Sequence, residues 1–177
     1  MTTSKARRER GFTMVELIIV LVVVGILSAI AFNRFFSRTG FDAAGFAAQV
    51  KATLRFGQRL AIAQNRPIYV YLDATSVALC YAATCSSTNR VKDPGGGNSF
   101  NGTGQCSTDR SWACVAPPAN VTLVLSPASA AHNHFYFDAA GKPQLNTGAE
   151  FSSLNLLVRA GDDQQPIRVQ WETGYVY

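Results

Sequence analysis

The hydrophobic pattern changes character twice along this chain. Residues 12–32 are apolar apart from a single charged side chain, Glu16. In residues 34–66 apolar side chains recur at steps of three or four positions, at Phe46, Val50, Leu54 and Ala61, which predicts an amphipathic helix. No proline occurs between Phe12 and Pro67, so the pattern predicts one long helix whose first half is apolar all round.

From Pro67 onward the period shortens to two, which predicts strands. The first two strands would form a hairpin, and residues 83–120 would form a long loop rich in glycine and proline. A long helix laid across an antiparallel sheet is an α+β domain. The predicted strands are residues 67–72, 77–81, 121–125, 134–138, 154–160, 166–172 and 175–177.

The net positive charge of the chain lies in residues 1–66. The 177 residues have a formal net charge of +5, but residues 67–177 hold six basic and eight acidic side chains, a net charge of −2. This distal part is therefore not a basic body, which argues against a nucleic-acid-binding surface spread over it.

Four cysteines lie in the distal part, at Cys80, Cys85, Cys106 and Cys114. Beyond an export segment, an even number of cysteines predicts two disulfides in an oxidising compartment. Three connectivities are open, and we favour the local pairs Cys80–Cys85 and Cys106–Cys114. Zinc is the alternative, but the spacing contains no CxxC pair.

The N-terminal segment has the layout of an export or membrane signal. A basic stretch, residues 5–10, precedes an apolar segment that spans about 31 Å as a helix, enough to cross a bilayer. An ordinary signal peptide would be cut after Ala31, but the apolar run is longer than usual and contains Glu16. A plain membrane anchor leaves Glu16 unexplained, since a charge inside a bilayer costs roughly 2.5–3.5 kcal/mol and marks function.

Residues 10–18 read Arg-Gly-Phe-Thr-Met-Val-Glu-Leu-Ile. This run resembles the class III signal of type IV prepilins and type II secretion pseudopilins. The resemblance implies that a prepilin peptidase cuts after Gly11 and methylates the new amine of Phe12. It also implies a pilin fold, a single pass through the bacterial inner membrane with a periplasmic domain, and assembly with other subunits through an inner-membrane platform.

Glu16 would then lie in the first turn of the mature helix, where unpaired N–H groups and the positive helix end favour an anion. The α-ammonium group of the same subunit or of a neighbouring subunit would offset the remaining cost of placing the Glu16 carboxylate in apolar surroundings. The expected organisation is a leader at 1–11, a membrane or filament-core helix at 12–33, an amphipathic helix at 34–66 and a β-rich domain at 67–177. Asn33 stands where many pilins have proline, which leaves a kink there open.

The distal part resembles the GspH/FimT group of minor pilins and pseudopilins, and residues 33–41 look like the minor pilins of mannose-sensitive haemagglutinin (MSHA) pili. The resemblance to the GspH/FimT group rests on residues 61–67, 135–141, 167–169 and 173–174. The resemblance implies a structural subunit. The sequence has no nucleophile elbow, no phosphate-binding loop and no histidine–carboxylate spacing of a hydrolase, so we expect no enzyme and no cofactor. A DNA- or surface-binding minor pilin and a soluble exported protein are the alternative functions.

DNA capture by some FimT-type pilins uses a Gly-Arg-x-Arg tail, but here residues 174–177 read Gly-Tyr-Val-Tyr. Without those cations the attraction to phosphate is missing, so we expect the two tyrosines to close the sheet instead. His132 and His134 would share one strand face, but no further ligand is fixed by spacing, so we predict no metal site.

Overall fold

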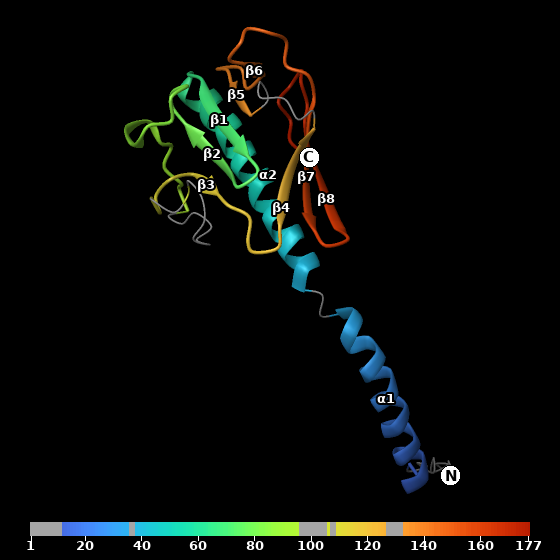
Figure 1. Ribbon diagram of the computed structural model, residues 1–177. Coiled ribbons are helices and arrows are strands. Elements are labelled where there is room, and N and C mark those ends of the chain that lie inside the picture. The colour runs from blue at the N-terminus through green and yellow to red at the C-terminus, as the bar shows by residue number, and fades with distance from the viewer. Residues whose placement is uncertain (1–11, 36–37, 96–105, 107–108, 127–132) are drawn as a thin grey trace, which may run out of the picture. The chain divides into compact units, whose positions relative to one another are not determined.

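The structure, a computed structural model, describes residues 12–35, 38–95, 106, 109–126 and 133–177 (Figure 1). The predicted leader, residues 1–11 with the cleavage residue Gly11, lies outside the described residues. The chain divides into two compact units, Met1–Ser37 and Arg38–Tyr177, which are described separately below.

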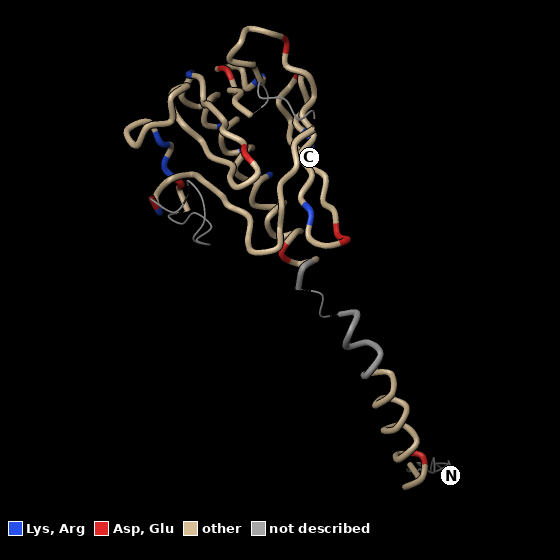
Figure 2. The backbone as a smooth tube through the Cα atoms, in the orientation of Figure 1, with Lys and Arg blue, Asp and Glu red and all other residues tan. Residues whose placement is uncertain are grey.

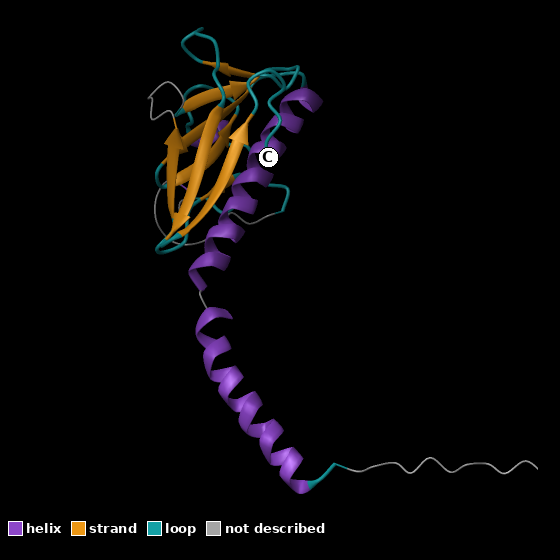
Figure 3. Cartoon of the chain, turned by 90° about the vertical axis from the view of Figure 1, so that its right-hand side faces the viewer, coloured by secondary structure: helices purple, strands orange, loops and turns teal. Residues whose placement is uncertain are grey.

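Two α-helices, a short 3-10 helix and eight strands make up the described chain. The helices are α1 (Met14–Phe35), α2 (Arg38–Gln64) and η1 (Ser87–Asn89). The strands are β1 (Ile68–Asp73), β2 (Ser76–Cys80), β3 (Cys114–Val115), β4 (Thr122–Ser126), β5 (His134–Phe137), β6 (Pro143–Leu145), β7 (Leu154–Ala160) and β8 (Asp163–Val169). Figure 3 shows the strands of the second unit gathered on one side of α2.

The single long helix expected from the sequence is present as two helices, α1 and α2. Residues 36 and 37, between them, lie outside the described residues, so the continuity of the helix stays a prediction. Helix α2 ends in a Schellman motif, in which the Arg66 N–H donates to the Ala61 carbonyl at 3.2 Å and Asn65 has a φ of 50°. Pro67 follows directly and prevents further helix.

The strands form two antiparallel sheets, not the one sheet that the sequence predicted. One sheet has the order β3-β2-β1-β5-β6 and the other β4-β7-β8. The alternation did not predict β3 and β6, because they have only two and three residues. Strand β8 begins at Asp163, which pairs with Ala160, and the predicted last strand is reduced to a bridge between Val169 and Val176.

The predicted apolar stripe of α2 is buried, which confirms the amphipathic pattern. Its members have exposed fractions of 2% or less, and α2 contacts strands of both sheets. The stripe consists of Phe46, Val50, Leu54 and Ala61. One helix therefore supplies the shared core of both sheets, and its packing determines where each sheet lies.

A second, smaller core organises the region predicted as a long loop. It contains the two disulfides, Cys80–Cys85 and Cys106–Cys114, which are the local pairs that we favoured. Trp112 lies among them, its indole N–H donating to the Leu79 carbonyl at 2.8 Å. These contacts hold the segment after β2 against the five-stranded sheet, as loop closure by disulfides predicts.

Candidate functional site

The first turn of α1 is built around Glu16 and Thr13. The Thr13 hydroxyl accepts a hydrogen bond from the backbone N–H of Glu16 at 3.2 Å, and the Leu17 N–H donates to the Thr13 carbonyl at 3.2 Å. Thr13 is thus the N-cap and Glu16 the third helical residue, the spacing of a capping box. The carboxylate is placed where the helix dipole favours a negative charge.

The surface of α1 is apolar on every side and exposed. Every side chain from Phe12 to Ser28 is exposed, and Figure 2 shows this stretch without charge except near its N-terminal end. The hydroxyl of Ser28, a polar residue in this stretch, donates a hydrogen bond to the Val24 carbonyl at 2.7 Å. Burying each large apolar side chain gains roughly 1.5–3 kcal/mol, so this helix has tens of kcal/mol to gain from an apolar partner.

Membrane crossing was predicted for residues 12–33. Within the described ranges, no helix combines the length and the apolarity required to cross a membrane.

The C-terminal tail is held on α2 by two polar side chains that we call the tail clasp, Arg55 and Gln58. The Arg55 guanidinium donates twice to the Val176 carbonyl, at 3.0 and 2.8 Å. The Gln58 amide donates to the carbonyls of Gly141 and Thr173, at 3.0 and 2.7 Å. One turn of the helix therefore joins the turn before β6 to the end of the chain.

The tail tyrosines lie at the edge of the three-stranded sheet, where their backbone pairs with the end of β8 while their side chains stay exposed. Tyr175 and Tyr177 are 59% and 45% exposed, and their rings stack with centroids 5.8 Å apart. The side chain that enters the core is Val176, because alternate residues of an extended segment point to opposite faces. The tail thus closes the sheet edge through its backbone, and its register decides which side chain points inward.

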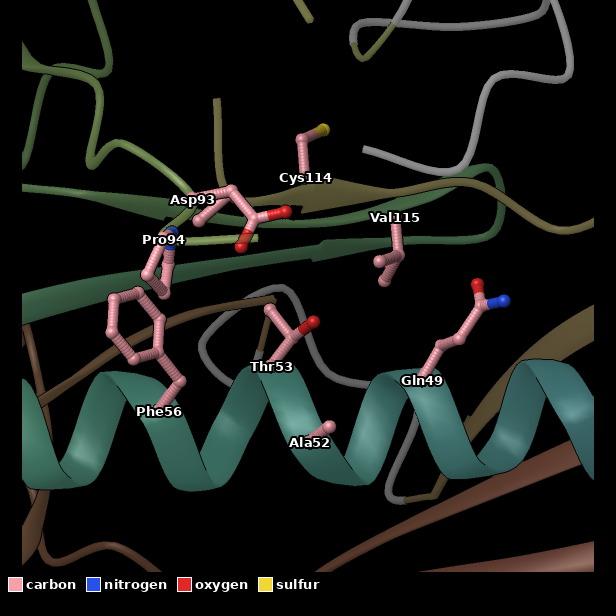
Figure 4. Close-up of a pocket in the computed structure, with 9 residues that line it drawn as sticks. Gln49, Ala52, Thr53, Phe56, Asp93, Pro94, Cys114 and Val115 are labelled. Atoms are coloured by element: carbon pink, nitrogen blue, oxygen red, sulfur yellow. The ribbon is translucent and has the colours of Figure 1, made fainter. Parts of the chain in front are cut away.

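A groove of about 520 Å³ lies between α2 and the edge strand β3 (Figure 4). Gln49, Thr53 and Phe56 line it from the helix, and Asp93 and Pro94 line it from the opposite side. The one carboxylate among the lining residues already accepts a hydrogen bond from the Gly95 N–H at 3.1 Å. A single satisfied carboxylate provides no acid–base pair, so these lining residues supply no catalytic set.

The expected sharing of one strand face by His132 and His134 is not tested, because His132 lies outside the described residues. His134 packs edge-on against Tyr71 with ring centroids 4.6 Å apart. Among the residues that the structure describes, no group of three or more His, Cys, Asp or Glu side chains is arranged to hold a metal ion.

Two groups in the second unit have shifted pKa values, for structural reasons. Burial raises the pKa of the Tyr71 phenol and outweighs the lowering effect of the Cys85 backbone. Hydrogen bonds from the Ser111 hydroxyl and N–H lower the pKa of the Asp109 carboxyl, and Arg90 lies 3.7 Å from it. Both groups lie around the disulfide core, where they belong to its packing.

Sequence reasoning missed two features of these sites. The capping role of Thr13 was readable from the Thr-x-x-Glu spacing. The tail clasp had no such signal, because Arg55 and Val176 are 121 residues apart and only the fold joins them.

The N-terminal residues match the prokaryotic N-terminal methylation motif over residues 6–32. The fold is similar to the crystal structure of the type IV minor pilin FimU of Pseudomonas aeruginosa, with a TM-score of 0.50 and 14% identity over 76% of this chain and 85% of that one. The minor pseudopilin EpsH of the type 2 secretion system of Vibrio cholerae gives a TM-score of 0.47 and 14% identity over 77% of this chain and 94% of that one. No curated protein sequence matches at a significant level.

The chain therefore combines a prokaryotic N-terminal methylation motif with a fold similar to that of a type IV minor pilin. Its fold is the α+β pilin fold, an N-terminal helix followed by antiparallel sheets with disulfides.

Proposed function

We propose that this protein is a minor subunit of a type IV pilus, of the MSHA-like kind, or of a type II secretion pseudopilus. A prepilin peptidase cleaves after Gly11 and methylates the amine of Phe12. The apolar helix holds the subunit in the bacterial inner membrane, with the second unit in the periplasm, until the assembly platform moves it into the filament. The observation that carries this proposal is an apolar helix, exposed from Phe12 to Ser28, with one carboxylate in its capped first turn.

Assembly follows from the chemistry of that turn. Removed from water, an uncompensated carboxylate is strongly penalised, whereas one that meets an ammonium group is stabilised. The Phe12 amine of a neighbouring subunit supplies that group at one axial register only, because the carboxylate occurs once along residues 12–32. The apolar surface of α1 then supplies the bulk of the association energy, and Glu16 selects the register.

Mass spectrometry of the mature N-terminus tests the processing step. We expect a chain that begins with N-methylphenylalanine at Phe12. A chain that begins at Phe32 would instead indicate an ordinary signal peptide and a soluble exported protein, and would refute the proposal, since Glu16 would be lost with the leader.

Filament incorporation of Glu16 variants tests the assembly step. Glu16→Ala is expected to be processed normally yet to be depleted from sheared filaments at least tenfold. Glu16→Asp, which keeps the charge on a shorter side chain, is the matched control and should retain part of the incorporation. Normal incorporation of the alanine variant would contradict the pairing.

A further inference from the structure

The outer face of the three-stranded sheet has an apolar row between two arginines. In the strand register, Val124 of β4 is opposite Leu157 of β7, and Leu157 is opposite Pro166 of β8. These three side chains form one row across the sheet on the face away from the core, since the neighbouring positions Leu123, Leu156 and Ile167 are buried. Val124 is 40% exposed, so the row faces solvent.

The two arginines lie in the rows on either side of this apolar row. Arg159 is two residues beyond Leu157 on β7, and Arg168 on β8 is opposite Asn155, two residues before Leu157. Four residues of strand and one strand spacing separate their Cα atoms by about 14 Å. Neither guanidinium makes an ion pair with a described residue, and the paired positions of this face include no carboxylate.

The C-terminal tail extends this surface. Arg168 and Tyr177 exchange two backbone hydrogen bonds, at 2.8 and 3.0 Å, so the half-exposed ring of Tyr177 continues the row that contains Arg168. A shallow hollow of about 440 Å³ lies over the sheet, lined by the apolar row and both arginines. We call these six residues, Val124, Leu157, Arg159, Pro166, Arg168 and Tyr177, the arginine face.

We propose that the arginine face docks a neighbouring subunit of the same filament, one that presents carboxylates on either side of an apolar side chain. This inference rests on the proposed function. Arginine and tyrosine around an apolar centre are the residue types that contribute most to protein–protein binding. Two guanidinium groups about 14 Å apart, without an ion-pair partner among the described residues and with no acidic side chain at the paired positions of their face, select an acidic partner.

A polypeptide fits this face better than a nucleic acid. The centre of the face is aliphatic, and two cations on a domain whose residues 67–177 have a net charge of −2 offer little attraction to a polyanion. The patch is small, about 250 Å² at the strand spacings, below the roughly 800 Å² per partner of a stable soluble complex. A subunit already held in a filament through α1 has a high effective concentration of neighbours, so a small face is sufficient.

Photo-crosslinking in the full chain tests this contact. A photoreactive phenylalanine analogue at Leu157, in cells that assemble the filament, is expected to crosslink to another subunit carrying the N-terminal methylation motif. Mass spectrometry should locate the crosslink beside Asp or Glu residues of that subunit. The double variant Arg159→Glu and Arg168→Glu should reduce the crosslinked fraction at least fivefold. Lys92→Glu, a single charge reversal at an exposed site outside the arginine face, is the control and should leave the crosslinked fraction unchanged.

A charge swap completes the test. Replacing the crosslinked acidic residues of the partner by lysine should restore crosslinking of the double variant. Three results would overturn the inference. The crosslinked fraction could be the same in the double variant as in the unchanged chain, or the crosslinks could form to nucleic acid or lipid. The third result is that neither a photoreactive residue at Leu157 nor, in a second variant, one at Val124 gives a crosslink to a subunit. Processing at Phe12 and Glu16-dependent incorporation are measured in the same cells. If they persist while crosslinking fails, only the docking inference is lost; if they fail, the proposed function is lost as well.

Discussion

The tail clasp predicts that Arg55 stabilises the second unit far more than an exposed arginine one turn away. Its guanidinium donates at 3.0 and 2.8 Å to the carbonyl of Val176, a residue that is completely buried. Hydrogen bonds to charged groups contribute about 1.5–3 kcal/mol, and both bonds meet one acceptor, so they are counted once. Arg55→Met keeps the volume of the stem and removes both donors, which should lower the free energy of unfolding by about 2 kcal/mol.

Urea unfolding of the full chain in detergent measures this loss through tryptophan fluorescence, because Trp112 is buried in the disulfide core. With a denaturant slope of about 2 kcal/mol per molar, the midpoint should fall by about 1 M. Arg59→Met is the control, since Arg59 is exposed and makes no hydrogen bond or ion pair with a described residue. Such exposed substitutions stay within about 0.5 kcal/mol.

Arg55→Lys should give an intermediate midpoint, because lysine keeps the charge but cannot donate two parallel hydrogen bonds. The reasoning is refuted if Arg55→Met and Arg59→Met unfold at the same urea concentration. That result would mean that the tail stays on α2 through the burial of Val176 alone.

Three further predictions concern the disulfide core and the turns of the second unit. Replacing Cys106 and Cys114 together by serine opens a loop with a sequence separation of 8, which should cost about 2.5 kcal/mol in urea unfolding under oxidising conditions and nothing after reduction. Gly174→Ala forces a left-handed φ of 69° and a clash with the Gly141 carbonyl, so it should destabilise more than Gly148→Ala, where φ is 75° but the space is open. Burial raises the pKa of the Tyr71 phenol above its ordinary 10.0, so the unfolded chain loses the phenol proton at a lower pH than the folded chain. The contribution of Tyr71 to the free energy of unfolding is therefore complete below pH 10.0 and declines above it. Tyr71→Phe should reduce the fall of the urea midpoint at alkaline pH.

The pattern of the chain determined the features that depend on neighbours in sequence. The apolar run with Glu16, the stripe of α2 and most strands could be predicted because a helix or strand places its side chains by a fixed period. The local disulfides were also predictable, since pairs separated by 5 and 8 residues need little chain to close.

Only the tertiary structure decided the features that join distant segments. The division into two sheets, the short strands β3 and β6, and the tail clasp depend on contacts across most of the chain, which no local period encodes. The exposure of the Tyr175 and Tyr177 side chains belongs to the same group of features. The tail has no pattern of its own, and its register against β8, set by Val176 entering the core, determines which side chains meet water.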